Sequence, residues 1–231
     1  MSDGAELAKS RKSGLPARRY LEYKRGGLNP EGAKVEKDRL IAFSDGVIAV
    51  IITIMVLELK APPDASLDAL KTVAPVFLSY VLSFVYVAIY WNNHHHFFTL
   101  VSHVSGSVMW ANLHLLFWLS LIPFATSWLG EHPSEPIPTA VYGLSLLMPA
   151  IAWFVLQGVL IRDHDGNASM LARALGGDLK GKVSPLLYLA SIFLAFVNPL
   201  ISDTIFILVA LLWLVPDRRI EKMTQQGRVE P

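Results

Sequence analysis

Polar and ionisable residues interrupt three otherwise apolar stretches of this sequence. Ser44 and Asp45 stand near the start of the first stretch, a run of histidines ends the second, and Asn112 and His114 lie within the third. Carboxylate, imidazole and amide groups can bind a metal ion, relay protons or hydrogen-bond to one another. Their spacing and their surroundings decide among these roles.

The run of histidines does not form a metal-binding pattern. On a regular helix His94, His95 and His96 point about 100° apart, so they cannot converge on one ion. A zinc site would need a further ligand such as His103 or His114, and the chain has neither a cysteine nor an HExxH motif. We therefore predict no metal site and no cofactor.

Asp45 lies in a strongly hydrophobic setting. Residues 40–59 form an apolar run about as long as the roughly 20 residues that an α-helix needs to cross a bilayer. An ionised carboxylate in such a helix must face protein or water, because exposure to lipid is costly. The first predicted helix therefore packs against partners.

Further apolar runs follow the first. They cover residues 73–93, 104–128, 138–161, 183–197 and 201–215, and the whole chain is 53% hydrophobic, with a mean hydropathy of +0.43 and no cysteine. This composition predicts an all-α integral membrane protein, a bundle of six helices without disulfides. A soluble enzyme is excluded.

The basic residues favour one orientation in the membrane. Of the 20 Lys and Arg residues, all but Lys60 and Lys71 lie up to Arg39, between the fourth and fifth runs, or after the sixth. By the positive-inside rule, both termini are therefore cytosolic. We predict three segments, which are a partly disordered basic tail (1–38), a six-span domain (39–216) and a cytosolic C-terminal tail (217–231).

The basic residues of the N-terminal tail have a simple explanation. Arg18, Arg19, Lys24 and Arg25 enforce the topology from a solvated tail, and contact with anionic membrane lipid is a secondary possibility. We expect no nucleic-acid partner.

The first helix carries a branched-aliphatic stripe. Val50, Ile54 and Leu57 share one face at about 100° per residue, and Thr53 lies on its shoulder. Such a stripe can be a packing seam between helices. It can also line a pore as a hydrophobic constriction.

The residues that begin this helix resemble a known signature. The pattern of Arg39, Phe43, Ser44 and Asp45 before the apolar run is similar to that of the transmembrane protein 175 family of potassium channels. Two further sets continue the resemblance, in the second and third runs: Tyr90, Trp91, His94 and His95, and Asn112, Pro123, Phe124 and Ala125.

The resemblance implies a homotetramer whose four copies of the first helix surround a potassium pathway. Val50 aligns with the family's narrow point, Ile54 and Leu57 with the aliphatic rings beyond it, and Thr53 with a hydroxyl position. Potassium would be preferred because aliphatic rings penalise the more tightly hydrated sodium ion. A single six-span unit resembles the bacterial form, which implies a bacterial plasma membrane.

The resemblance also implies a polar network around the motif. Its expected members lie at one depth of the membrane, where hydrogen bonds can satisfy Ser44 and Asp45. The candidates are Arg39, Phe43, Ser44, Asp45, Trp91, His94, His95, Asn112 and His114.

Other functions remain open on the sequence alone. A proton-conducting or weakly selective cation leak could use the same pore, with Asp45 and the histidines as a relay. A small-solute transporter is disfavoured because the first helix is unbroken and no internal repeat is visible. A membrane enzyme lacks a nucleophile–base pair or a metal set.

Overall fold

The computed structural model describes residues 30–164 and 179–214, and all regular secondary structure in these two ranges is α-helical. The all-α prediction is confirmed for these residues. The helices are α3 (Pro30–Leu57), α4 (Leu67–Thr72), α5 (Ala74–Thr99), α6 (Gly106–Leu119), α7 (Ile122–Glu131), α8 (Pro136–Asp163), α10 (Leu179–Leu194) and α11 (Pro199–Leu214). The basic run at residues 18–25 and the C-terminal tail 217–231 lie outside the described residues.

Within residues 30–164 and 179–214, four segments are long and apolar enough to cross a membrane. They are Lys34–Leu57, Ala74–Thr99, Gly106–Glu131 and Pro136–Asp163, of 24 to 28 residues each. Their lengths match the roughly 20 residues or more that a bilayer requires. The chain is therefore a membrane protein, as its composition predicts.

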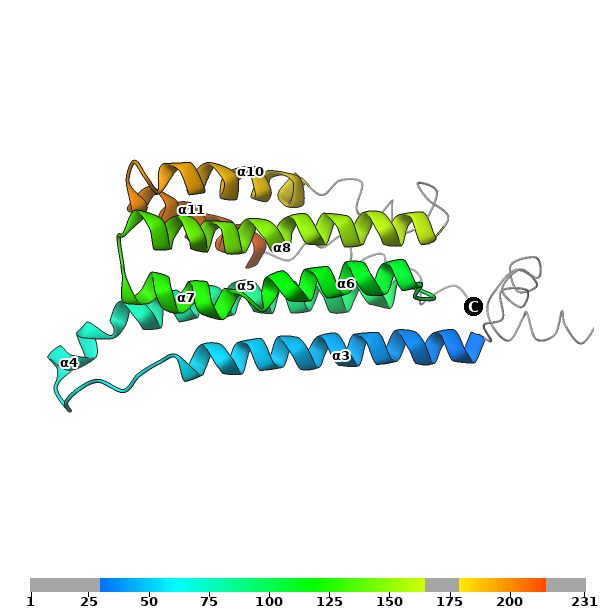
Figure 1. Cartoon of the computed structure of the whole chain (residues 1–231), viewed down its shortest axis with the longest axis horizontal. Helices are drawn as coiled ribbons and strands as arrows, with labels where there is room; N and C mark the ends of the chain where they lie inside the picture. Colours follow the sequence, from blue (N-terminus) through cyan, green and yellow to red (C-terminus); the bar gives the residue numbers. More distant parts are fainter. Residues whose placement is uncertain (1–29, 165–178, 215–231) are drawn as a thin grey trace, which may run out of the picture.

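The third predicted span is not one continuous helix. α6 ends at Leu119 and α7 begins at Ile122, although the two continue each other along the bundle (Figure 1). Pro123 has no backbone N–H, so it cannot donate to the carbonyl of Leu119 four residues earlier. The expected continuous span at 104–128 is therefore two helices with a turn between them.

Two helices extend beyond the boundaries predicted for them. α3 begins at Pro30, well before Arg39, so part of the predicted tail is helical. α5 continues past Asn93 to Thr99 and includes all three consecutive histidines. The extension of α3 is mostly polar and that of α5 begins with three histidines, so apolar periodicity alone does not detect them.

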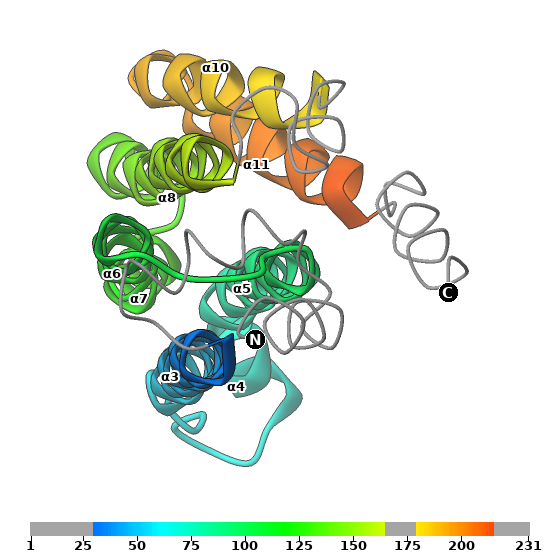
Figure 2. The ribbon, with the colours of Figure 1, turned by 90° about the vertical axis from the view of Figure 1, so that its right-hand side faces the viewer.

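The helices pack in sequence across the bundle. Viewed end-on, α3 lies at one edge beside α5 and α6, α8 follows, and α10 and α11 lie at the opposite edge (Figure 2). One hydrophobic cluster joins α3, α5, α6 and α8, and a second joins α5, α7, α8, α10 and α11. At Gly130 an added Cβ would lie 2.7 Å from the Cα of Val76, so this glycine permits the close approach of α7 to α5.

Candidate pore face and its polar anchor

α3 has a buried stripe that fixes it to the bundle. Its members recur every three or four residues and are at most 8% exposed: Leu40, Ser44, Ile48, Ile51 and Met55. The apolar members belong to the cluster shared with α5, α6 and α8. This spacing is that of one helix face, and it is the packing seam of α3 within the chain.

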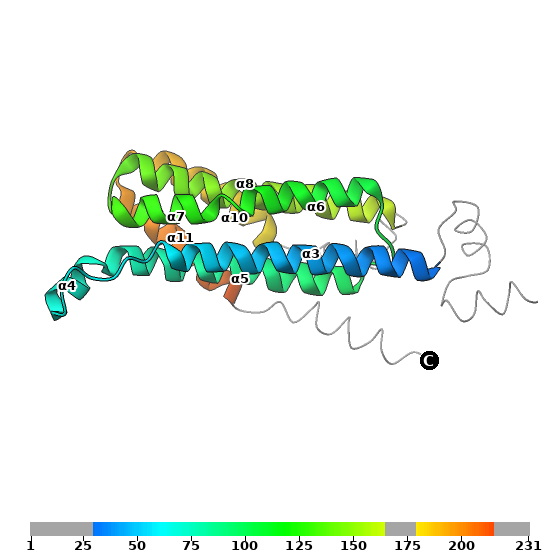
Figure 3. The ribbon, with the colours of Figure 1, turned by 60° about the horizontal axis from the view of Figure 1, so that its bottom comes forward.

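A second stripe of α3 is uncovered in the single chain. This open face consists of Phe43, Val50, Ile54 and Leu57, of which Val50 is 54%, Ile54 42% and Leu57 78% exposed, while Val47 beside it is partly buried against the core. Figure 3 shows α3 along the edge of the bundle that comes forward in that view. The aliphatic stripe recognised in the sequence is therefore not a packing seam between helices of one chain.

Thr53 is the polar residue beside the open face. It is exposed, and its hydroxyl donates to the carbonyl of Val50 at 2.9 Å within the same helix. Because the hydroxyl uses its hydrogen in that bond, the lone pairs of its oxygen stay available to accept a hydrogen bond or to coordinate a cation.

The opposite side of α3 is held by a buried chain of hydrogen bonds. Asn112 of α6 donates through Nδ2 to Ser44 Oγ at 2.8 Å, and Ser44 Oγ donates to the carbonyl of Leu40 at 2.8 Å. His94 Nε2 of α5 lies 2.8 Å from Asn112 Oδ1, which is an acceptor, so Nε2 is the donor. All of Ser44, His94 and Asn112 are buried.

Asp45 is held separately from Ser44. Trp91 of α5 donates its indole N–H to Asp45 Oδ1 at 3.0 Å. The Trp91 ring also stacks on His95, with centroids 6.0 Å apart. The two neighbouring motif residues are thus anchored to α5 and α6 by different partners, and together these contacts form the polar anchor of α3.

Among the described residues, four others expected in the network make no hydrogen bond with it, and one of these, Phe43, lies on the open face. His114 accepts from the indole N–H of Trp118, one turn along α6, at 2.9 Å. Arg39 is exposed and, among the described residues, makes no hydrogen bond or ion pair. His95 reaches the anchor only through the Trp91 ring.

The far end of α3 has polar contacts that sequence reasoning missed. Ser127 of α7 donates to Glu58 Oε2 at 3.1 Å, and Lys60 pairs with Glu131 at 3.2 Å. These residues lie at or near the ends of the apolar runs, and charged residues in such positions are the feature of the sequence that could have indicated the contacts. Their pairing could not be read without knowing that α7 lies beside α3.

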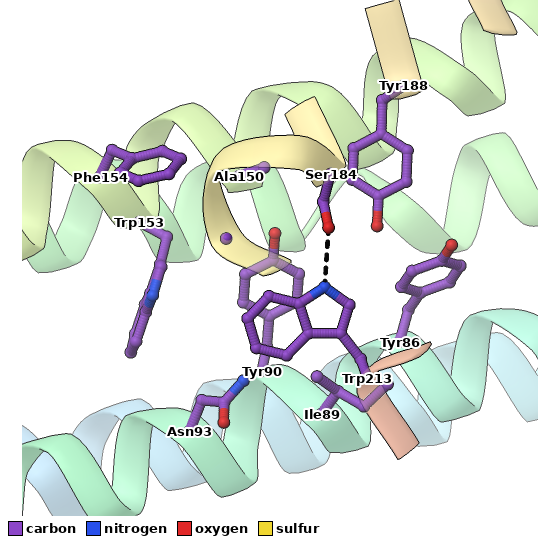
Figure 4. Close-up of a pocket in the computed structure, with 11 residues that line it drawn as sticks. Tyr86, Ile89, Tyr90, Asn93, Ala150, Trp153, Phe154, Ser184, Tyr188 and Trp213 are labelled. Carbon is purple, nitrogen blue, oxygen red and sulfur yellow. Dashed lines mark hydrogen bonds between the residues drawn. The ribbon is translucent and has the colours of Figure 1, made fainter. Parts of the chain in front are cut away.

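An aromatic cavity lies between α5, α8, α10 and α11. Tyr86, Tyr90, Trp153, Tyr188 and Trp213 contribute to its wall, and the Trp213 indole donates to Ser184 Oγ at 2.8 Å (Figure 4). It encloses about 40 Å³, which is room for only a few water molecules. This cavity therefore does not compete with the open face as a functional site.

Known proteins with similar sequences are ion channels. The sequence model of the family described as "Endosomal/lysosomal potassium channel TMEM175" matches residues 39–123. A potassium channel of Chryseobacterium sp. strain P1-3 is 51% identical over 191 residues, which cover 83% of this chain and 99% of that protein. A potassium channel of Streptomyces collinus is 36% identical, over 55% of this chain and 66% of that protein.

Other relatives and one solved structure extend the comparison. The endosomal/lysosomal proton channel TMEM175 of the mouse is 25% identical over 47% of this chain and 23% of its own length. The crystal structure of a lysosomal potassium-selective channel TMEM175 homologue from Chamaesiphon minutus matches with a TM-score of 0.69 and 28% identity, covering 78% of this chain and 97% of that one. The chain belongs to the TMEM175 family of ion channels, and it is not an enzyme.

Proposed function

We propose that this chain is a potassium channel of the bacterial plasma membrane, a homotetramer in which α3 of each copy lines the pore. Its bacterial relatives are named potassium channels, and the structural neighbour is described as potassium-selective. The family relationship supports the activity. The geometry of α3 supports the path of the ion.

The open face of α3 is the observation that carries this proposal. α3 has two different faces. One stripe is buried within its own chain, whereas Val50, Ile54 and Leu57 are left uncovered. One helix cannot enclose a channel, so several copies around a common axis are required. The uncovered stripe then faces the axis.

Selectivity in this proposal comes from partial dehydration. Rings of Val50, Ile54 and Leu57 form a hydrophobic constriction that penalises the more tightly hydrated sodium ion. The Thr53 hydroxyl, already oriented by its bond to the Val50 carbonyl, offers oxygen to potassium as water is lost. The same rings serve as gate and selector.

The polar anchor has a structural role in this proposal. Ser44, Asn112 and His94 fix the rotation of α3 about its axis, because the Asn112–Ser44 bond joins α6 to α3 and the His94–Asn112 bond holds that amide in place from α5. A rotation of one residue, about 100°, would turn a different stripe toward the axis. The anchor thereby keeps Val50 in the pore.

The topology follows the distribution of charge. We propose six spans with both termini in the cytosol, in agreement with the positive-inside rule. α10 and α11 have 16 residues each, or about 24 Å at 1.5 Å per residue. Helices of that length suit a locally thin region of the bilayer.

The experiment is ion flux in liposomes containing the purified chain. With potassium inside and sodium outside, a reversal potential close to the potassium equilibrium value is the expected result. A potential that follows the pH gradient and ignores potassium would contradict the proposal.

That contradicting result would support a second candidate, a proton channel through the same pore. Vertebrate relatives named proton channels favour it, as do the carboxylate of Asp45 and the imidazole of His94 near one mouth of the pathway.

A substitution at the constriction tests the path of the ion. Val50→Asn wets the narrow ring, so we expect a several-fold higher conductance and a lower preference for potassium over sodium. The matched control is Val56→Asn, since Val56 is an exposed residue of α3 outside the open face. Unchanged selectivity in Val50→Asn would place the selecting ring elsewhere.

A further inference from the structure

A second cluster of ligand-type side chains lies away from the open face of α3. His103 is in the connection between α5 and α6, and Asp163 and His164 end α8. One ligand atom from each lies within 4.8 Å of the other two. The cluster is at the same end of the bundle as the start of α3 (Figure 1).

The two imidazoles are brought together by the way the chain turns. After α5 ends at Thr99 the chain passes the last turn of α8, and the rings of His103 and His164 stack with centroids 4.3 Å apart and planes at 26°. His103 Nε2 lies 3.6 Å from Asp163 Oδ2. This separation is near the distance between two donors on one tetrahedral zinc ion, about 3.4 Å for bonds of about 2.1 Å.

His164 is already oriented as a metal ligand would be. Its Nδ1 is 3.1 Å from the carbonyl of Leu160, which can only accept, so Nδ1 carries the proton. Its Nε2 therefore has the lone pair, which accepts a long bond of 3.3 Å from the N–H of Ser102, and a metal ion on Nε2 would replace that bond. Metal-bound histidines characteristically donate their other N–H to a carbonyl or carboxylate.

Asp163 supplies an independent observation. Its Oδ2 atom is buried and has no hydrogen-bond partner in the described part of the chain. His103 Nε2, at 3.6 Å, is too distant for a hydrogen bond and forms an ion pair with this oxygen only when the imidazole is protonated. A buried carboxylate oxygen without a partner is costly, and a cation held between Asp163 and the two rings would satisfy it.

In contrast to the sequence-based expectation of no metal site, we propose that His103, Asp163 and His164 bind a divalent transition metal ion of the zinc class, with water in the fourth position. Two imidazoles and one carboxylate are a ligand set for zinc, nickel or cobalt. Magnesium and calcium prefer sites made of oxygen ligands. This proposal is independent of the ion that the pore conducts.

The site would join α8 to the segment that supports α3. Lys37 of α3 donates to the carbonyl of Val101 at 2.9 Å, two residues before His103. A metal ion on His103 and His164 would therefore fix this connection against the end of α8. Binding should stabilise the folded chain, because the metal binds the folded state alone.

The experiment is calorimetric titration of the full-length chain, purified in detergent without a polyhistidine tag. We expect Zn²⁺ to bind at one site per chain and Mg²⁺ to give no heat at the same concentrations. His103→Gln and Asp163→Asn should each weaken Zn²⁺ binding at least tenfold. Zn²⁺ should also raise the melting temperature of the unmodified chain and leave that of His103→Gln unchanged.

The control is the double variant His96→Gln/His132→Gln, which removes two exposed histidines outside the cluster and should bind Zn²⁺ as the unmodified chain does. His103 is only partly buried, so His103→Gln keeps the test valid should Asp163→Asn fail to fold. Absence of Zn²⁺ binding, or binding lost in the double variant and retained in His103→Gln, would overturn the proposal.

Discussion

The two ends of α3 are attached to the bundle in different ways. At the motif end (residues 39–45), Ser44 is fully buried and bonds to the equally buried Asn112. At the distal end (residues 54–60), Lys60 and Glu131 pair with side chains 80% and 44% exposed. Buried hydrogen bonds lose much when broken, whereas exposed ion pairs contribute little. The motif end is therefore the firmly held end of α3.

The largest effect is expected from Asn112→Ala. The substitution leaves Ser44 without its donor and His94 without its acceptor in a buried site, and it opens a cavity. We expect the free energy of unfolding to fall by about 3 kcal/mol, measured as a loss of melting temperature and of the proposed tetramer in detergent. Asn92→Ala, at an exposed position of α5, should change it by less than about 0.5 kcal/mol. Equal stability of the two variants would show that the buried bonds at the motif end do not hold α3 firmly.

Asp45→Ala should have an intermediate effect. It removes the acceptor of the Trp91 indole, but Trp91 is 44% exposed and can find another partner. We expect a loss of about 1 kcal/mol, with fewer tetramers by light scattering and an unchanged potassium-to-sodium ratio. A fully assembled tetramer with altered ion preference would show that Asp45 acts on the ion and not on α3.

Ser127→Ala tests the distal end. Its bond to Glu58 is exposed, so water replaces it, and we expect a loss of less than about 0.5 kcal/mol. Thermal unfolding in detergent is the measurement. A loss as large as that of Asn112→Ala would mean that both ends of α3 are held equally.

Lys60→Met should have the smallest effect. The exposed pair with Glu131 is expected to contribute no more than about 0.5 kcal/mol, and less in concentrated salt because of screening. Melting temperatures at low and high KCl check both statements. A large difference that persists at high salt would contradict this description of the pair.

Much of the fold could be predicted from hydropathy and charge. The apolar runs located the helices of membrane length, and Asn198 and Pro199 marked the separation of α10 from α11. The break at Pro123 was missed, because an apolar run of the right length conceals the missing backbone bond. The start of α3 at Pro30 was missed because its first residues are polar.

The polar anchor of α3 could also be predicted only in part. The sequence indicated that Ser44 and Asp45 need polar partners, since both sit in a membrane-length helix. It could not assign Asn112 to one and Trp91 to the other, because that depends on the rotation of α5 and α6. His114 was grouped with them by depth, but its partner, Trp118, is one turn away on its own helix.

The interruption between α6 and α7 has a mechanical consequence for the third span. Its first half is tied to the motif end of α3 through Asn112, and its second half to the distal end through Ser127. A bend at Leu121 would therefore move the motif end of α3, through the buried Asn112 bond, more than the distal end, where the exposed bond to Ser127 contributes little. In the proposed pore, the two mouths would then change in width by different amounts.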